Sequence, residues 1–373
     1  MSHSHQHRPE LQKAIEEIAG SGFTGVTLRV HDERGEWAGS AGTAEPGGVA
    51  KPPIDGYVRI GSNTKTFTAT LVLQLVAEGA VELDVPAAVY LPSLGLDERI
   101  TVRMLLQHTS GVFNFSGEVL ADGTVVPGIP IPYGDTGAEW VANRFRSYPP
   151  GELVRRALAA PARFVPGAGW SYSNTNYVLA RLLVEAVTGR SYAEELRRRI
   201  LLPLGLSGTI APDLSPEIPE PYARAGYRYE EAGEPKTIDV SRHNPSWVSG
   251  GGDLISTTRD LEVFIGALNR GELLPAGLLA EMRTPHPTGI PGMDYGLGVF
   301  VLTTAGGTLV SHNGATVGHA ALMYSTLDGR KTLTAALNCV DDPGMSVATA
   351  FRTAQQRLVD AVFAGEPAEL RAR

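Results

Sequence analysis

The chain has 373 residues, of which 43% are hydrophobic and 19% are charged, and its net charge at pH 7 is -8. This length and composition exclude a disordered protein and predict a core large enough for two lobes or one elaborated domain. The acidic balance, without any basic run, argues against nucleic-acid binding and against an anionic membrane surface, and no apolar run approaches the length of a transmembrane helix.

The N-terminal residues are polar and rich in histidine, and residues 10–20 have the pattern of an amphipathic helix. They lack the charged, apolar and cleavage regions of an export signal, so the chain as written is expected to be cytoplasmic, although a secreted mature form would look the same. Metal binding by His3, His5 and His7 is less expected than an exposed tail.

A β-hairpin and a helix are predicted next. Residues 25–30 alternate between apolar and polar side chains, residues 32–35 supply a turn, and residues 36–42 return. The run from Thr66 to Glu78 then has helical periodicity, with an apolar face wide enough to be buried.

A possible nucleophile stands at the start of this helix, in Ser62-Asn63-Thr64-Lys65. Residues three apart share one face of a helix, so the Ser62 hydroxyl and the Lys65 amine would be within reach of each other. A serine needs a neighbouring base to become a nucleophile, and a buried lysine can supply one. The alternative is a capping serine beside a solvated lysine.

Two further polar motifs lie downstream. Tyr172-Ser173-Asn174 offers a phenol and an amide just before a helical pattern that starts near Tyr177, and His312 and Gly314 follow a β-patterned stretch. In isolation, the first motif could merely cap the helix and His312 could be a structural histidine. The combination with Ser62 and Lys65 favours a catalytic site.

The remaining pattern predicts an α/β fold, in which strands at both chain ends form one antiparallel sheet flanked by helices, with an inserted helical lobe. Residues 1–80 and 245–373 are assigned to the sheet lobe and residues 81–244 to the mainly helical lobe. The expected later helices are residues 102–108, 177–188, 191–201, 259–269 and 346–364. The expected later strands are residues 296–303, 308–312, 320–325 and 332–338. The single Cys339 falls in an apolar run and is expected to be a buried structural thiol.

The order of these motifs is similar to the Ser-x-x-Lys, Ser-Asp-Asn and Lys-Thr-Gly signature of penicillin-recognising enzymes. With Tyr-Ser-Asn second and His-x-Gly third, the chain resembles the serine β-lactamase and penicillin-binding-protein-like family, in particular the D-alanyl-D-alanine carboxypeptidases and class C β-lactamases. The resemblance extends from about Leu11 to about Phe363. It includes residues 59–61, 73–79, 100–111, 250–261 and 295–298.

The resemblance implies a β-lactamase/transpeptidase-like fold with the site in a cleft between lobes. It implies that Ser62 becomes acylated and that Lys65 and Tyr172 share the proton transfers, with either of them as the base. Tyr172, placed near two cationic groups, is expected to have a lowered pKa. Asn174 is expected to orient Lys65 and a substrate carbonyl.

The third motif is expected to bind substrate along a strand edge, through His312, Asn313, Gly314 and Ala315. His312 would set the field there, Gly314 would let the substrate backbone lie close, and the N–H groups of Ser62 and Ala315 would form the oxyanion hole. Trp247 is a weaker prediction, as an aromatic wall of the cleft. His108 is expected to be structural, in the turn that ends a helix.

The chain departs from the carboxypeptidases where they grip a free substrate carboxylate. Asn313 and Ala315 replace two hydroxyl side chains, and residues 299–302 lack the expected arginine. Each bond of such a clamp can contribute roughly 1.5–3 kcal/mol. Unless another cation such as Arg242 or Arg259 substitutes, the loss argues against a carboxypeptidase or a penicillin-specialised β-lactamase.

The predicted function is therefore that of a serine hydrolase or acyltransferase. Its small-molecule or peptide substrate would be an ester, thioester or amide, including D-configured ones, as for related esterases, D-aminopeptidases and peptide-cyclising thioesterases. The alternatives are a carboxypeptidase or β-lactamase, and, from another class, a non-catalytic penicillin-binding sensor or a structural relic. No cofactor and no catalytic metal is expected, because His or Cys clusters are lacking outside the N-terminal tail. The acyl acceptor and the oligomeric state stay open.

Overall fold

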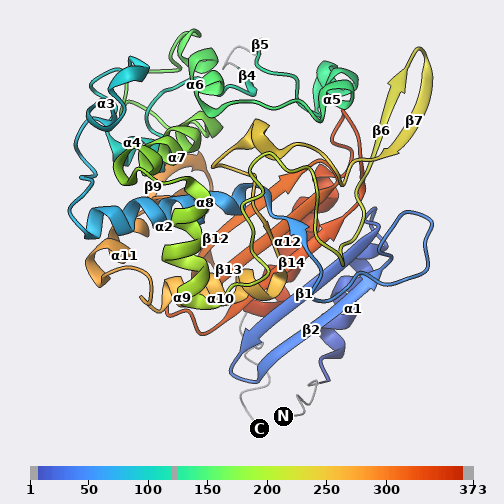
Figure 1. Cartoon of the computed structure of the whole chain (residues 1–373). Helices are drawn as coiled ribbons and strands as arrows, with labels where there is room; N and C mark the ends of the chain where they lie inside the picture. Colours follow the sequence, from blue (N-terminus) through green and yellow to red (C-terminus); the bar gives the residue numbers. More distant parts are fainter. Residues whose placement is uncertain (1–6, 120–123, 364–373) are drawn as a thin grey trace.

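The computed structural model describes residues 7–119 and 124–363 and centres on an antiparallel sheet of eight strands (Figure 1). In sheet order the strands are β2 (Gly35–Gly42), β1 (Gly25–Asp32), β14 (Thr332–Asn338), β13 (His319–Thr326), β12 (Gly307–Thr316), β11 (Phe300–Thr304), β10 (Met293–Tyr295) and β9 (His286–Ile290). The N-terminal hairpin thus joins the C-terminal strands through the pairing of β1 with β14. The fold class predicted from the sequence is confirmed.

Helices cover both faces of this sheet. On one face, α1 (Pro9–Ala19) and α12 (Ala348–Phe363) pack their apolar side chains against β1, β13 and β14, with Leu11, Leu28 and Leu358 fully buried. On the other face lie α2 (Thr64–Ala77) and α10 (Thr258–Asn269), in a core that includes Phe67, Phe264 and Met323. Side chains alternate between the two faces of a strand, so the register of the sheet decides which side chains of β12 point toward α2.

The segment between α2 and α10 carries most of the remaining elements. Its helices are α3 (Ala87–Tyr90), α4 (Val102–Gln107), α5 (Gly137–Asn143), α6 (Pro150–Leu158), α7 (Asn174–Thr188), α8 (Tyr192–Leu196) and α9 (Leu202–Leu204). The small strands pair as β4 (Gly117–Val119) with β5 (Val125–Pro127), β3 (Val58–Arg59) with β8 (Ile255–Ser256), and β6 (Gly226–Glu231) with β7 (Glu234–Asp239) and β15 (Val340–Asp341). Helix α11 (Ala276–Met282) precedes β9. The division at residues 81 and 244 stays a prediction.

Helix α2 differs from the predicted amphipathic helix, because it is buried nearly all round. Its threonines tolerate this environment because their hydroxyls find partners. Thr66 donates to the carbonyl of Gly298 at 2.8 Å, and Thr68 donates to the carbonyl of Gly250 at 2.7 Å. Buried hydroxyls need such partners. The helix therefore ties the segments around Gly298 and Gly250 to one central rod.

Some expectations at single positions can now be compared with the structure. Strand β11 starts at Phe300 rather than at Gly296, because Gly298 has a φ of +81° and turns the chain beside α2. Cys339 is 7% exposed, and burial raises the pKa of its thiol to about 12, as suits a structural residue. His3 and His5 lie outside the described residues.

Candidate active site

Ser62 and Lys65 lie together at the start of α2. Ser62 is on the 3₁₀ turn Gly61–Asn63, and Lys65 is in the first turn of the helix that follows. The Lys65 Nζ is 3.0 Å from the Ser62 Oγ, so the contact predicted from their spacing is present. Ser62 keeps part of its surface exposed, whereas Lys65 is fully buried. A substrate can therefore reach the hydroxyl while the amine lies beneath it.

The hydrogen-bond partners of Lys65 are uncharged. Its Nζ donates to Asn174 Oδ1 at 2.8 Å and to the carbonyl of Gly251 at 2.7 Å. Burial lowers the pKa of Lys65 to about 7, against the raising effect of the Asp253 charge. A neutral amine has two N–H groups, and each can donate a hydrogen bond to one of these two oxygens. Its lone pair is then left for the proton of the Ser62 hydroxyl.

Asn174 is held in place by the start of α7. It is the first residue of that helix, and its backbone N–H donates to Asn114 Oδ1 at 3.2 Å. The amide side chain then turns toward Lys65. The orienting role predicted for Asn174 toward Lys65 agrees with this contact, whereas its role toward a substrate stays a prediction.

Tyr172 lies against the same pair. Its ring centroid is 4.8 Å from Lys65 Nζ, and its phenol hydrogen-bonds the Ser62 side chain. The ring also packs on His108, with 4.3 Å between ring centroids. The structure therefore brings together the three residues predicted to be catalytic, Ser62, Lys65 and Tyr172.

The expected lowering of the Tyr172 pKa is wrong. Burial raises the pKa of this phenol, and the contact with Ser62 offsets only part of the rise. The physical reason lies in the two neighbours that were expected to be cations, because the pKa of Lys65 is about 7 and that of His312 is about 3. Tyr172 therefore keeps its proton near neutral pH, which favours Lys65 as the base.

His312 is on the face of β12 that points toward this group. Its ring centroid is 6.5 Å from that of Tyr172, and its Nε2 is 3.1 Å from the Tyr295 hydroxyl. Burial lowers the pKa of His312 to about 3, with a further lowering by the charge of Lys65. The imidazole is thus a neutral hydrogen-bonding group in this place, whereas the lysine of the family motif would be a cation.

The backbone of β12 approaches the nucleophile closely. A Cβ added to Gly314 would lie 2.5 Å from Ser62 N, and one added to Gly61 would lie 2.6 Å from Ala315 N. Glycine is therefore required on both segments for this approach. The N–H groups of Ser62 and Ala315 belong to these adjoining segments, in agreement with the predicted oxyanion hole, which stays a prediction.

One edge of β12 is open beside Ser62. The pairing of β11 with β12 ends at Phe300 with Ser311, and among the described strands none continues along this edge at residues 312–316. An extended substrate can pair with such an edge through its own backbone.

The side chain of Asn313 does not match its predicted role. It lies on the face of the sheet covered by α12, where its Nδ2 donates to the Tyr324 hydroxyl at 2.9 Å. The alternation of side chains along a strand explains this, because His312 occupies the opposite face. Asn313 can therefore serve a substrate through its backbone, whereas its amide is engaged elsewhere.

Trp247 is mostly a core residue. Its side chain is 8% exposed and meets Trp140 edge to face, with 6.5 Å between ring centroids. Only a small part of the ring can line a cleft, so the structure gives little support to the predicted aromatic wall.

The cations proposed as substitutes in a carboxylate clamp are placed elsewhere. Arg242 forms an ion pair with Glu217 on the surface. Arg259 acts electrostatically on Arg29 of β1, a strand separated from β12 by β14 and β13. Arg242 is thus already paired with a carboxylate, and the place of Arg259 near β1 argues against a role at the open edge of β12.

Sequence reasoning missed the carbonyl of Gly251 as a partner of Lys65, because a backbone atom leaves no side-chain signature. The run of three glycines at 250–252 was the available signal, since a Cβ on Gly251 would lie 3.3 Å from Lys65 Nζ. Tyr295 was also missed as the partner of His312. His108 was expected to be structural, and it does end α4, with a φ of +63°.

Two absences concern only the described residues. Within 7–119 and 124–363, no three His, Cys, Asp or Glu side chains gather in a way that could hold a metal ion. In the same part of the chain, none of the helices combines the length and the apolar character needed to cross a membrane.

Solved structures of two amidases resemble this fold along nearly the whole chain. A D-stereospecific amidohydrolase from Streptomyces sp. superposes with a TM-score of 0.82 and 34% identity, covering 97% of this chain and 100% of its own. The D-amino acid amidase from Ochrobactrum anthropi SV3, in a complex with L-phenylalanine, gives a TM-score of 0.81 and 26% identity over 96% of this chain and 99% of its own.

Relatives also appear among curated proteins. Penicillin-binding protein 4* of Bacillus subtilis (strain 168) is 27% identical over 83% of this chain and 65% of its own length. Esterase EstB of Burkholderia gladioli is 34% identical over 41% of this chain and 38% of its own. The chain thus spans less than two thirds of the length of these curated relatives. Residues 11–357 match the sequence profile described as Beta-lactamase, and with these likenesses the chain belongs to the beta-lactamase family, the group of serine β-lactamase- and penicillin-binding-protein-like proteins.

Proposed function

We propose that the chain is a serine hydrolase that forms an acyl-Ser62 intermediate on amides and esters, including those of D-amino acids. The observation that carries the proposal is the contact of 3.0 Å between the Ser62 hydroxyl and Lys65, an amine with a pKa of about 7. A base with a pKa near the working pH is efficient, because it is partly unprotonated and still accepts a proton well.

In the acylation step, the Ser62 Oγ bonds to the substrate carbonyl carbon while its proton passes to Lys65 Nζ. The carbonyl oxygen becomes an oxyanion that faces the N–H groups of Ser62 and Ala315. The bond to the leaving group then breaks, and the leaving amine or alcohol takes a proton from the Tyr172 phenol, which regains one from Lys65. Each group therefore returns to its starting protonation state when the acyl-enzyme has formed.

In the deacylation step, water attacks the acyl carbon of Ser62. Lys65, acting with Tyr172, takes a proton from this water, and the proton is delivered to Ser62 Oγ as the acid leaves. Another nucleophile such as an amine could replace water, which would make the protein an acyltransferase or a peptide-cyclising thioesterase.

The proposed substrate class rests on two considerations. The likeness to a D-stereospecific amidohydrolase and to a D-amino acid amidase supports amides of D-configured acyl groups. The likeness to an esterase supports esters. The positions of Arg242 and Arg259 disfavour a carboxylate clamp at the β12 edge, so a substrate need not end in a free carboxylate.

The test is a panel of D-phenylalanine amide, L-phenylalanine amide, a p-nitrophenyl ester, a peptidyl thioester and nitrocefin, each with the wild type and with Ser62→Ala. We expect kcat/KM for the D-amide to exceed that for the L-amide at least tenfold, with all turnover lost in Ser62→Ala. Efficient hydrolysis of nitrocefin without turnover of amides or esters would instead identify a β-lactamase. Acylation without any turnover would identify a sensor.

A further inference from the structure

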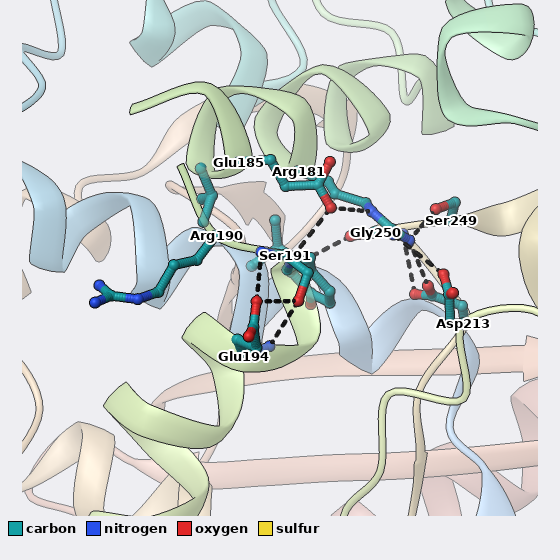
Figure 2. A network of polar contacts seen from close by, with 12 residues as sticks. Arg181, Glu185, Arg190, Ser191, Glu194, Asp213, Ser249 and Gly250 are labelled. Carbon is teal, nitrogen blue, oxygen red and sulfur yellow. Dashed lines mark hydrogen bonds and ion pairs between the residues drawn. The ribbon is translucent and has the colours of Figure 1, made fainter. Parts of the chain in front are cut away.

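A network of charges adjoins the turn that contacts Lys65, and its members Arg181 and Asp253 are largely buried. Figure 2 shows Arg181 of α7 extending toward Ser249, which directly precedes Gly250, and toward Asp213 of another loop. The same turn, residues 249–253, supplies the Gly251 carbonyl that accepts a hydrogen bond from Lys65. The mechanism described above uses none of these charged side chains.

Asp253 closes this turn from within. Its Oδ1 accepts a hydrogen bond from the backbone N–H of Gly250 at 3.0 Å, and only 2% of the residue is exposed. Gly250 has a φ of +71°, a conformation that favours glycine. Its carbonyl in turn accepts the bond from Thr68 of α2. The turn is thereby held against the helix that carries Lys65.

Arg181 holds the other side of the turn. Its Nη1 is 3.5 Å from Asp253 Oδ2 and also donates to the Ser249 hydroxyl. Its Nε donates to Glu185 at 3.1 Å, one helical turn along α7. The Arg181 stem also fits against the glycine, because a Cβ on Gly250 would lie 2.7 Å from the Cβ of Arg181. Arg181 is thus fixed by both charge and packing.

The pair also acts on Lys65 through charge. Asp253 is the carboxylate whose field favours the protonated form of Lys65, although no hydrogen bond joins the two side chains among the described contacts. The Arg181 cation lies 3.5 Å from Asp253, so by Coulomb's law it offsets part of the field of that carboxylate. It also keeps Asp253 more ionised than burial alone would allow. A buried charge without a partner is costly, so the two side chains depend on each other.

We propose that Arg181 and Asp253 are positioning residues, which place the Gly251 carbonyl on Lys65 and balance the charge behind it so that Lys65 can act as a base near neutral pH. The base role within this inference rests on the proposed function, whereas the electrostatic coupling does not. Two other carboxylates of the network, those of Asp213 and Glu185, form ion pairs with Arg181.

Other titratable groups face Lys65 from the remaining elements. Tyr172 lies before α7 and Tyr177 within it, at 4.8 and 5.5 Å from Nζ to the ring centroids. His108 follows α4 and His312 lies on β12, and Lys65 acts electrostatically on both. Burial holds both phenols and both imidazoles in their neutral forms, with raised pKa values for the tyrosines and lowered ones for the histidines. Asp253 is therefore the acidic group that a substitution can remove, and burial raises the pKa of its carboxyl against the lowering effect of Arg181.

The experiment is an NMR titration of Lys65 in the full chain labelled with [13Cε]lysine. The chain has five lysines, so the spectrum is simple, and Lys65→Met assigns the signal. Asp253→Asn keeps an oxygen for the Gly250 N–H but removes the charge. The double variant Arg181→Met/Asp253→Asn removes both charges and leaves the local net charge unchanged. It therefore leaves neither partner as an unpaired buried charge, which would destabilise the fold.

We expect Asp253→Asn to lower the pKa of Lys65 by about one unit or more, because a charge within about 12 Å shifts a pKa by at least one unit at an effective dielectric constant of about 20. The double variant should return it to within about 0.3 unit of the wild type. Arg199→Met is the matched control, because Arg199 is similarly buried and pairs with Glu195 and Glu78 away from Lys65. It should lower stability without moving this pKa.

An unchanged or raised Lys65 pKa in Asp253→Asn would overturn the proposal, as would a double variant that shifts as far as the single one. The NMR readout needs no turnover, so it separates this inference from the proposed function. The second readout is the rate at which a fluorophosphonate labels Ser62 as a function of pH. If the Lys65 pKa shifts and the labelling profile does not follow, the coupling stands and the role of Lys65 as the base fails.

Discussion

The Tyr295 hydroxyl lies 3.1 Å from Nε2 of His312, and the other ring nitrogen, Nδ1, lies 2.9 Å from the carbonyl of Asn313. A carbonyl oxygen can only accept, so Nδ1 carries the proton and Nε2 accepts the bond from the phenol. Both nitrogens are thus satisfied without a positive charge. This arrangement agrees with the lowering of the His312 pKa to about 3 by burial.

The pH dependence of kcat/KM should follow the titration of Lys65, because His312 stays neutral. Lys65 has a lowered pKa of about 7, so below that pH it is protonated and has no lone pair for the Ser62 proton. We expect kcat/KM for a p-nitrophenyl ester to fall about tenfold per pH unit below about pH 7 and to level off above it. His312→Gln should leave the position of this limb unchanged. A limb that disappears in His312→Gln would assign the titration to the histidine instead.

Lys65 and Tyr172 should behave as one proton-transfer unit, since both contact Ser62. We expect Lys65→Ala and Tyr172→Phe each to lower kcat by about a hundredfold or more, the scale for losing a positioned acid or base. The double variant should be little worse than either single variant, because groups that act together are not additive. Steady-state kinetics on one ester provide the comparison, and fully multiplicative losses would show independent roles.

Selectivity against a free carboxylate is the third prediction. We expect a peptide ending in D-alanine amide to be processed at least as well as the same peptide with a free acid, because a carboxylate without a clamp is left partly desolvated and unpaired. The measurement is kcat/KM for both peptides at fixed salt. A preference for the acid of tenfold or more, about 1.4 kcal/mol, would restore the carboxypeptidase function.

A matched variant tests the same residues from the opposite direction. The double variant Asn313→Thr/Ala315→Thr would restore the two hydroxyl-bearing residues of the carboxypeptidase motif. At 313 the substitution also releases the contact with Tyr324. Because the Asn313 side chain faces α12 and strand alternation places residue 315 on the same face, we expect little change in the preference. A move toward the acid would show that hydroxyls at these two positions reach the substrate.

Asn63 should be important for stability rather than for chemistry. It is fully buried, and its Nδ2 donates to the carbonyls of Ile60 at 2.9 Å and Ala321 at 3.0 Å, which ties the Ser62 turn to β13. We expect Asn63→Ala to lower the free energy of unfolding by about 1–3 kcal/mol, because a buried acceptor loses its donor. The control is Asn143→Ala, where one exposed bond is lost and the change should stay within about 0.5 kcal/mol. Equal denaturant midpoints for the two variants would contradict the prediction.

The part of the site that could be predicted from sequence is the part set by helical spacing and by motif order. The three-residue step from Ser62 to Lys65 fixed their contact, and the polar triplet at the start of α7 placed Tyr172 and Asn174 beside them. The N-terminal hairpin and the C-terminal strands were predictable because alternation over several residues is a strong local signal.

What could not be predicted depends on long-range packing. The Tyr172 pKa was misjudged because it depends on the charges of Lys65 and His312, which burial in the folded chain decides. The Asn313 amide was misplaced because the partner that draws it away, Tyr324, lies on another strand. The hairpin of β6 and β7 was missed because most of β7 is exposed and lacks an apolar face.

Catalysis through an acyl-enzyme on Ser62 can be tested by mass spectrometry of the acid-quenched protein during turnover of a p-nitrophenyl ester. We expect one added acyl group, mapped by peptide digestion to Ser62 and absent in Ser62→Ala. It should accumulate to a higher level in Tyr172→Phe if deacylation is slowed more than acylation. An acyl group on another residue, or undiminished ester hydrolysis by Ser62→Ala, would contradict this mechanism.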